Sequence, residues 1–291
     1  MREPRDVTAQ QKGGGTLLVV ATPIGNLGDM TERALEALRA CDRVLAEDTR
    51  RTRHLLTHFG IGGKRLDRLD AHATERDVAR VVEELAAGER VALVTDAGTP
   101  GVSDPAEALV GAAIGAGVRV VPIPGASAVL AALVVSGLAG DGRFRFVGFL
   151  PREGRERRAS IALVCDTPEA VVLFESPNRT AATLRDLADA TPDRRVCVAR
   201  ELTKLHEEMV RGTLAELAQD PREWLGEIAM VLGVHAPEER GAQLDEASVD
   251  ARIDEALARG EHLRTIAERL AAWSGRPKRE LYARVLTRKK R

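Results

Sequence analysis

The chain has 291 residues, enough for about two domains with sizeable cores. Hydrophobic residues make up 44 %, charged residues 30 %, and the formal net charge is −1, which excludes wholesale disorder and a strong overall basic field for nucleic acid. Aromatic residues make up only 3 %, which excludes a surface that binds nucleic acid mainly by base stacking.

Strands and helices alternate after a polar, flexible leader at 1–14. Continuous apolar runs predict buried strands at 16–21 and 90–95, and shorter or less apolar runs predict strands at 43–46 and 118–123. Apolar stripes bounded by glycine or proline predict helices at 31–40, 54–59, 76–87 and 105–115. This alternation predicts a largely parallel α/β domain over residues 15–123.

The second half of the chain also alternates strands with helices. The patterns predict strands at 143–149, 170–174, 196–200 and 227–234. They predict helices at 128–135, 156–163, 180–190 and 213–218. We therefore expect a second α/β domain with a mixed sheet over 124–235, followed by a charged linker at 236–248.

A helical, basic C-terminal module is expected at 249–291. Between Trp273 and Arg291 there are eight Lys and Arg residues and one acid, a local excess of +7. A basic terminal segment is a candidate for phosphate contacts, and the alternative is a solvated end of the chain.

The three cysteines, Cys41, Cys165 and Cys197, form neither a CxxC pair nor a zinc pattern with the histidines. We therefore expect free thiols, no metal and a reducing, cytoplasmic compartment. No uncharged apolar run is long enough to cross a membrane, and the leader lacks the apolar core of a signal peptide.

Three loops that follow buried strands combine glycine with proline, at 22–28, 96–104 and 124–128. Glycine permits close approach of a ligand to the backbone, and ligands of open α/β sheets lie beyond the carboxyl ends of the strands. The loops predict a pocket lined by backbone, although each alone is compatible with an ordinary turn. Neither a P-loop nor a GxGxxG sequence after the first strand is present.

Five segments form a distinct set: Ala21-Thr-Pro-Ile-Gly-Asn-Leu27, Ala46-Glu-Asp-Thr-Arg50, Thr95-Asp-Ala-Gly-Thr-Pro-Gly-Val-Ser-Asp-Pro105, Pro122-Ile-Pro-Gly-Ala-Ser-Ala128 and Phe174-Glu-Ser-Pro-Asn-Arg179. In this order they resemble the ribosomal small subunit methyltransferase I family, the 16S rRNA cytidine 2′-O-ribose methyltransferases of the tetrapyrrole methylase superfamily. The resemblance implies a two-domain α/β fold, S-adenosylmethionine in the cleft between the domains, and a homodimer.

The resemblance also implies cofactor contacts, carried over position by position. They fall on Pro23, Asp96, Gly98, Thr99, Pro100, Gly101, Val102, Ser127, Ala128, Ala199, Arg200, Glu227 and Ile228. Thr99 stands where the superfamily has an acid, so Asp96 or Asp104 is expected to substitute for it.

Transfer to a ribose hydroxyl gains from a nearby base, and Glu175, at the end of a buried strand, is the first candidate, with Asp48 and His54 as alternatives. The competing interpretation of Glu175 is a loop acid that pairs with Arg179. The competing interpretation of His54 is a residue on the surface of a helix. Guanidinium groups grip phosphate, although salt bridges to neighbouring acids compete. The candidate RNA contacts are Arg50, Arg51, Arg53, Arg179, Lys278 and Arg279.

The first functional hypothesis is an S-adenosylmethionine-dependent RNA ribose 2′-O-methyltransferase acting on 16S ribosomal RNA or the small ribosomal subunit. Two alternatives stay open: a methyltransferase of the same superfamily acting on a corrinoid or porphyrin precursor, and a non-catalytic nucleic-acid-binding adaptor. The intact glycine and proline loops weigh against the adaptor.

Overall fold

The structure is a computed structural model, which describes residues 14–70, 73–102, 106–235, 246–258, 261–274 and 277–289. The expected leader at 1–14 and linker at 236–248 therefore lie almost entirely outside the described residues, as does Asp104. Contacts group the chain into two compact units. Residues 166–168 join those from His235 onward in the second unit, and all others belong to the first.

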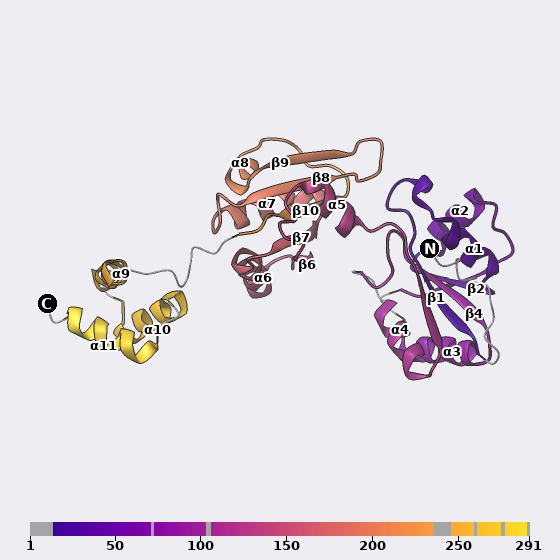
Figure 1. Cartoon of the computed structure of the whole chain (residues 1–291), viewed down its shortest axis with the longest axis horizontal. Coiled ribbons are helices and arrows are strands. Elements are labelled where there is room, and N and C mark those ends of the chain that lie inside the picture. The colour runs from indigo at the N-terminus through magenta and orange to yellow at the C-terminus, as the bar shows by residue number, and fades with distance from the viewer. Residues whose placement is uncertain are drawn as a thin grey trace. The chain divides into compact units, whose positions relative to one another are not determined.

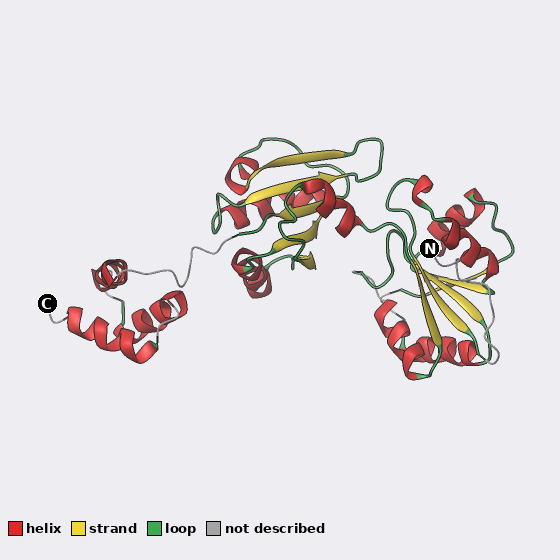
Figure 2. Cartoon of the chain, in the orientation of Figure 1, coloured by secondary structure: helices red, strands yellow, loops and turns green. Residues whose placement is uncertain are grey.

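The first sheet of the first unit is wholly parallel, as the buried apolar runs predict (Figures 1 and 2). Its strand order is β3-β2-β4-β1-β5. The strands are β1 (Thr16–Val20), β2 (Arg43–Ala46), β3 (Arg65–Arg68), β4 (Arg90–Val94) and β5 (Arg119–Ile123). Strand β3 was not expected, because its sequence, Arg-Leu-Asp-Arg, has no apolar run and it pairs only at the sheet edge.

Helices cover both faces of this sheet (Figure 1). On one face lie α1 (Glu32–Ala40) and α2 (Thr49–His58), and on the other α3 (Glu75–Ala86) and α4 (Ala106–Gly115). A short 3-10 helix, η1 (Leu27–Asp29), follows β1. Helix α2 begins five residues earlier than predicted, because Asp48 accepts a hydrogen bond from the backbone N–H of Arg50 and caps its first turn.

Arg43, at the start of β2, is the largest fully buried side chain of the described residues. Its guanidinium lies 3.1 Å from Asp67, 2.5 Å from Glu84 and 3.6 Å from Glu89. A buried charge is tolerated when it is paired and hydrogen-bonded. These acids therefore hold β2, β3 and the end of α3 together at the edge of the sheet opposite to the loops discussed below.

The second sheet is mixed, as expected, with the order β6-β7-β10-β8-β9. Only the β6–β7 pair is parallel. The strands are β6 (Phe144–Phe149), β7 (Ala170–Glu175), β8 (Arg195–Arg200), β9 (Glu208–Thr213) and β10 (Ile228–Leu232). The edge strand β9 was not expected, because its residues are only partly apolar.

Helix α5 (Ala128–Ser136) packs against one face of the second sheet. Three helices cover the other face: α6 (Gly154–Asp166), α7 (Pro177–Ala188) and α8 (Leu214–Ala218). Ile24, from the loop after β1, joins the α5 core together with Leu202, so the loops of the two sheets pack directly on one another. The expected division near residue 124 stays a prediction, since the contacts place both sheets in one unit.

The second unit is helical, as predicted for the C-terminal module. Its helices are α9 (Glu246–Ala258), α10 (Leu263–Ser274) and α11 (Lys278–Lys289). They share a core that includes Ile253, Ile266, Leu281 and Val285. This unit therefore has an apolar core of its own.

All three cysteines are free thiols and buried, as expected. Burial raises the pKa of the Cys41 and Cys197 thiols, so both stay protonated at neutral pH. Within the described part of the chain, no helix combines the length and the apolar character that a membrane crossing requires.

Candidate functional site

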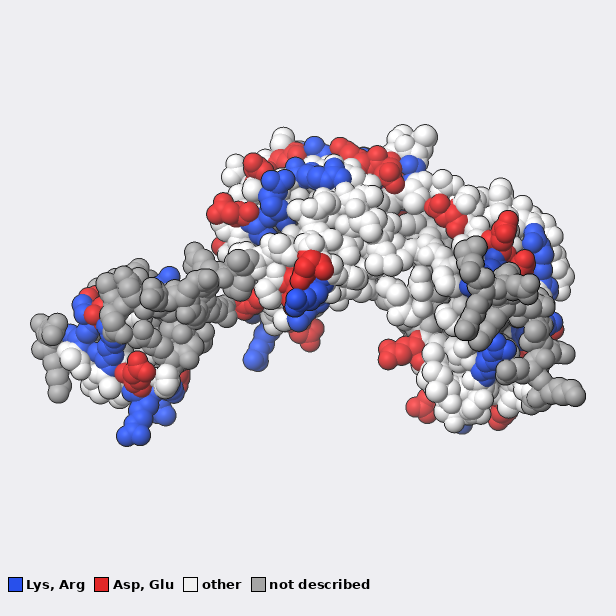
Figure 3. Space-filling view, in the orientation of Figure 1, with Lys and Arg blue, Asp and Glu red and all other residues white. Residues whose placement is uncertain are grey.

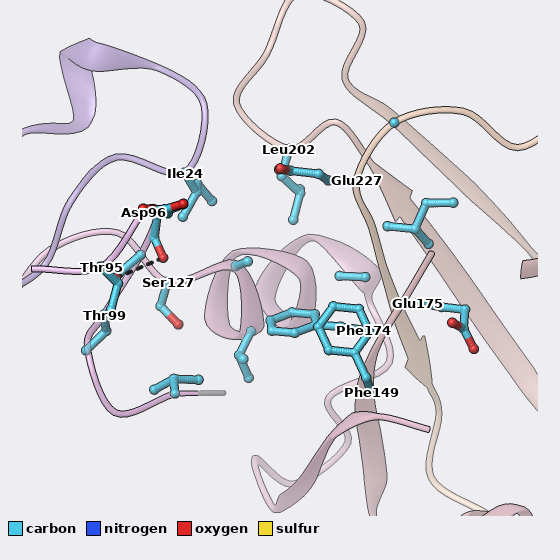
Figure 4. A pocket seen from close by; sticks show the side chains of 18 of the residues that line it. Ile24, Thr95, Asp96, Thr99, Ser127, Phe149, Phe174, Glu175, Leu202 and Glu227 are labelled. Atoms are coloured by element: carbon cyan, nitrogen blue, oxygen red, sulfur yellow. Dashed lines mark hydrogen bonds between the residues drawn. The ribbon is translucent and has the colours of Figure 1, made fainter. Parts of the chain in front are cut away.

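A cavity of about 450 Å³ lies within the first unit, where the loops of the two sheets meet (Figure 4). Each of the five motifs found in the sequence contributes to its wall. The contributions are Ile24, Glu47, Thr95–Thr99 with Val102, Ser127–Ala128 and Phe174–Pro177. The volume is in the range of pockets that bind small molecules and cofactors. Segments spread over more than 150 residues of sequence therefore converge on one site.

The loops from the first sheet are bound to one another by backbone hydrogen bonds. Thr22 and Gly98 exchange two, with N···O distances of 2.9 and 3.0 Å. The Thr99 hydroxyl donates to the carbonyl oxygen of Ala126 at 3.0 Å, which links the loop after β4 to the loop before α5. Gly98 and Gly101 have φ values of +82° and +90°, a region that favours glycine. The glycines thus allow the tight path that forms this wall.

Asp96 is an acid on this side of the cavity that two contacts hold in place. Its Oδ1 accepts a hydrogen bond from the backbone N–H of Asp48 at 3.0 Å, and its Oδ2 lies 3.5 Å from the Arg51 guanidinium. Glu47 and Arg51 also line the cavity. The site therefore presents a carboxylate whose position is held from two directions.

Asp48 and His54, the alternative bases, do not line the cavity. The Asp48 carboxylate accepts hydrogen bonds from the backbone and guanidinium of Arg50, which lower its pKa to about 2. The carboxylate is thus committed to capping α2. His54 is exposed on the same helix, which agrees with the surface interpretation.

The second sheet supplies the opposite wall. Phe149, Phe174 and Leu202 line it, together with Gly226–Ala229, so Glu227 and Ile228 lie where they were expected. Ala199 and Arg200, which were also expected at the cofactor, do not line the cavity. Ala199 is fully buried in the core under α5, and Arg200 pairs with Glu208 at 3.0 Å. Strand β8 lies beside β10 in the sheet, on the side away from β7, whose last residues line the cavity.

Glu175 borders the cavity, but its carboxylate is turned into the protein (Figure 4). Its side chain is 0 % exposed. The oxygens accept hydrogen bonds from the Thr183 hydroxyl at 2.7 Å and the Ser176 backbone at 2.9 Å, and Arg179 lies 3.3 Å away. The structure therefore contains the competing pairing with Arg179, and a role for Glu175 as the base stays a prediction.

The predicted RNA-binding arginines separate into different environments. Arg51 lies at the cavity, and Arg53 is exposed on α2. Arg50 is exposed and paired with Asp48. Arg179 is turned inward, because it also donates to the carbonyl oxygens of Leu150 and Pro151 at 2.7 and 3.0 Å. Its Nη2 and Nε groups are thus engaged within the protein, and its side chain is 26 % exposed.

In the C-terminal unit, Arg279 is exposed and Lys278 pairs with Glu268.

Of the expected cofactor positions in the loops, Pro23, Pro100 and Gly101 do not border the cavity, whereas Val102 does. Several lining residues were missed, among them Glu47, Phe149 and Leu202. Glu47 lay inside a motif already identified, but nothing in the local sequence distinguishes Phe149 or Leu202 from core residues.

No group of three or more His, Cys, Asp or Glu side chains with the spacing of a metal site occurs among the residues described. The cavity instead combines an apolar floor, which includes Val129, with three acids, Glu47, Asp96 and Glu227. Of these, Asp96 lies 3.5 Å from Arg51, and Glu227 pairs with Lys204 at 3.0 Å. This donor set suits a ligand that has an apolar or aromatic part and carries positive charge.

The comparisons with known proteins agree on one family. The profile of the family Tetrapyrrole (Corrin/Porphyrin) Methylases matches residues 16–218. The chain is 39 % identical to ribosomal RNA small subunit methyltransferase I of Halalkalibacterium halodurans over 277 residues, which cover 94 % of this chain and 95 % of the relative. It is 42 % identical to the protein of that name from Neisseria meningitidis, with 94 % of each chain covered.

Solved structures share the fold. The methyltransferase CobJ matches with a TM-score of 0.58 and 20 % identity, over 77 % of this chain and 95 % of CobJ. Diphthine synthase matches with a TM-score of 0.56 and 20 % identity, over 76 % of this chain and 91 % of that structure. At this identity the likeness concerns the fold alone.

Proposed function

Since this chain belongs to the tetrapyrrole methylase family, we propose that it is an S-adenosylmethionine-dependent methyltransferase of small-subunit ribosomal RNA. The observation that carries the proposal is the convergence of all five motifs on one cavity. Relatives named for this activity match over almost their whole length, the C-terminal module included. Following the resemblance of the motifs, we propose a cytidine 2′-hydroxyl of 16S RNA as the acceptor, and the cytoplasm as the compartment.

The cavity suits the methyl donor, S-adenosylmethionine. Its apolar wall, from Ile24 to Leu202 and Ile228, suits an adenine ring, and its carboxylates suit the positive charges of a methionine sulfonium. Held there, S-adenosylmethionine would supply a methyl group from its cationic sulfur to a hydroxyl oxygen and leave as a neutral thioether, and the hydroxyl proton would pass to water. Asp96 is already held by the Asp48 backbone and Arg51, so its charge is in place before binding.

Alignment accounts for much of the rate in this scheme. An in-line displacement needs the two reacting atoms at close range, and a rigid site supplies that geometry. The Thr22–Gly98 hydrogen bonds and the Thr99–Ala126 hydrogen bond make the donor side rigid. Arg51, at the cavity edge, is suited to a phosphate of the RNA, which its guanidinium can grip in two places.

Transfer of tritium from labelled S-adenosylmethionine tests the function directly. The acceptors offered are small ribosomal subunits, protein-free 16S RNA and a corrinoid or porphyrin precursor. We expect label in RNA, and a nuclease digest locates it on a ribose. Label in the tetrapyrrole favours the small-molecule alternative, and binding of subunits without any label favours the adaptor.

Glu175→Gln separates a structural role from a catalytic one. The substitution removes the buried charge that Arg179 and Thr183 engage, so we expect the free energy of unfolding to fall by about 1.5–3 kcal/mol. The rate of methyl transfer by the folded enzyme is expected to stay within about threefold, because assistance by a true base is worth roughly 10²–10⁴-fold. Denaturant titration and single-turnover assays measure the two effects.

Thr183→Val is the matched control for Glu175→Gln, because it removes the partner hydroxyl and leaves the carboxylate in place. It is expected to destabilise the protein to a similar degree. A Glu175→Gln enzyme of normal stability that transfers methyl a hundredfold more slowly would restore Glu175 as the base.

We also propose that the protein is a homodimer in which a second copy covers the outer face of α5. That helix is apolar all round, and Val134 is 74 % exposed, with Leu130 and Val135 also exposed beside it. An apolar face of this kind is typical of an interface. The proposal follows the dimer that the family resemblance implies.

Val134→Asp is expected to shift the protein to monomers, since a buried charge without a partner strongly opposes association. Sedimentation velocity at micromolar concentration measures the change. Leu205→Asp, at a loop position 92 % exposed, is the control and leaves the assembly state unchanged. A dimeric Val134→Asp protein would place the interface elsewhere.

A further inference from the structure

The second wall of the cavity carries an exposed aromatic ring. Phe149 lines the cavity and is 58 % exposed. Its ring centroid lies 5.6 Å from that of Phe174, which in turn lies 5.0 Å from Phe146. Three of the five phenylalanines of the chain thus gather at the site, and Figure 4 shows Phe149 and Phe174 side by side, facing the loop that carries Thr95 and Asp96.

A bulge in β6 gives Phe149 this direction. Phe146 pairs with Val172, but Phe149 pairs with Phe174, so three steps of β6 match two of β7. Side chains alternate along a strand, and Val147 packs on the opposite face of the sheet from Phe146. In a regular strand Phe149 would follow Val147. The extra residue returns it to the face of Phe146 and Phe174.

Gly148 makes the bulge possible. Its φ of +65° lies in the left-handed region, which side chains with a Cβ rarely adopt. Bulges are frequent beside active sites, where they redirect a side chain. The backbone is therefore specialised to present an aromatic ring that the core does not need, because the ring stays more than half exposed.

A flat ring at the edge of a cavity suits a flat ligand, and two are available: the adenine of the donor and a base of the RNA. The residues around Phe149 favour the RNA base over the adenine. The chain runs from Phe149 through Leu150 and Pro151 to a segment in which three exposed arginines outnumber two exposed acids: Arg152, Arg155 and Arg158 against Glu153 and Glu156. Cations attract phosphate and repel a cationic donor. A donor ring is also expected on the enclosed apolar wall rather than at an exposed position.

The geometry points to Phe149 as the stacking platform for the base of the nucleotide that is methylated, with Arg152 and Arg155 beside it for the flanking phosphates. This inference rests on the proposed function. RNA-modifying sites commonly take an unstacked base onto an aromatic side chain. Overall RNA affinity still depends on phosphate contacts, while one ring fixes the target nucleotide.

Phe149→Ala is expected to lower kcat/KM for small ribosomal subunits by about tenfold to a hundredfold, the usual effect of removing one stacked base, and to weaken subunit binding. Calorimetry with S-adenosylmethionine is expected to give an unchanged Kd. Phe149→Trp retains a flat ring and is expected to restore kcat/KM to within about threefold of the parent. Because Phe149 is exposed, neither variant disturbs the core.

Phe144→Ala is the matched control, since Phe144 is also an exposed phenylalanine on β6 but does not line the cavity. It is expected to behave like the parent protein. A tenfold weaker S-adenosylmethionine Kd in Phe149→Ala would overturn the inference by assigning the ring to the donor, and unchanged kcat/KM would overturn it as well. If the parent protein transfers no label to RNA, the proposed function is contradicted instead. Binding of small ribosomal subunits by Phe149→Ala then still tests whether the Phe149 ring contacts RNA.

Discussion

Replacing Ala128 with tryptophan is expected to abolish S-adenosylmethionine binding while the protein stays folded. Ala128 is the first residue of α5, and its half-buried side chain lies on the cavity wall between Ser127 and Val129. An indole at this position projects into a cavity of about 450 Å³ that a cofactor must largely fill. The dissociation constant is expected to rise at least about a hundredfold, which corresponds to about 2.8 kcal/mol.

Isothermal calorimetry measures this loss, and circular dichroism and the melting temperature without ligand show that the fold persists. Ala108→Trp places the same side chain on an exposed position of α4 and is the matched control. It should retain the affinity of the parent protein and the rise in melting temperature that a ligand confers. Unchanged affinity in Ala128→Trp would mean that the donor binds outside this cavity.

Sequence patterns predict the parts of this fold that depend on local apolar content. The runs at β1, β2 and β4 are largely or wholly buried, so their continuous apolar character identifies strands of a parallel sheet, whereas β5, at the edge of the sheet, is only partly buried. The loops that follow them gather at one edge because parallel strands all end there. The location of the cavity could therefore be predicted from glycine and proline positions.

Side-chain direction could not be predicted in the same way. Glu175 turns away from the cavity because Thr183, two turns along α7, offers its hydroxyl. Phe149 turns toward the cavity because one extra residue enters β6. Both outcomes depend on contacts between elements, and a strand-end acid or an alternating phenylalanine has the same local sequence in either direction.

The surface charge of the C-terminal unit likewise could not be predicted from the local sequence. A local excess of +7 predicts a basic surface, but acids 34 to 38 residues earlier neutralise part of it. Arg284 lies 2.6 Å from Asp250, and Arg288 pairs with both Asp250 and Asp254 of α9. Figure 3 shows both signs of charge interspersed on the visible surface of this unit. The cations of α11 that remain exposed, among the residues described, include Arg279 and Lys289.

Removing residues 236–291 is expected to weaken binding of ribosomal RNA by tenfold or more and to leave the S-adenosylmethionine Kd unchanged. Every residue that lines the donor cavity lies at or before Ala229, and the second unit has its own core. A shorter deletion of α11 alone is less informative, because it removes Leu281 and Val285 from that core and unfolds the unit. Filter binding across a salt series and calorimetry provide the two measurements.

A double substitution tests the charges without disturbing the core. Each phosphate neutralised contributes about −0.7 to the slope of log affinity against log salt for single strands. Arg279→Ala with Lys289→Ala is therefore expected to flatten the slope by roughly 1.4 units. Arg33→Ala with Arg185→Ala removes two exposed arginines from α1 and α7 and keeps the total charge change equal. Equal slopes in the two double variants would show that α11 is a solvated surface, and would leave Arg51 and the Arg152–Arg155 segment to carry the phosphate contacts.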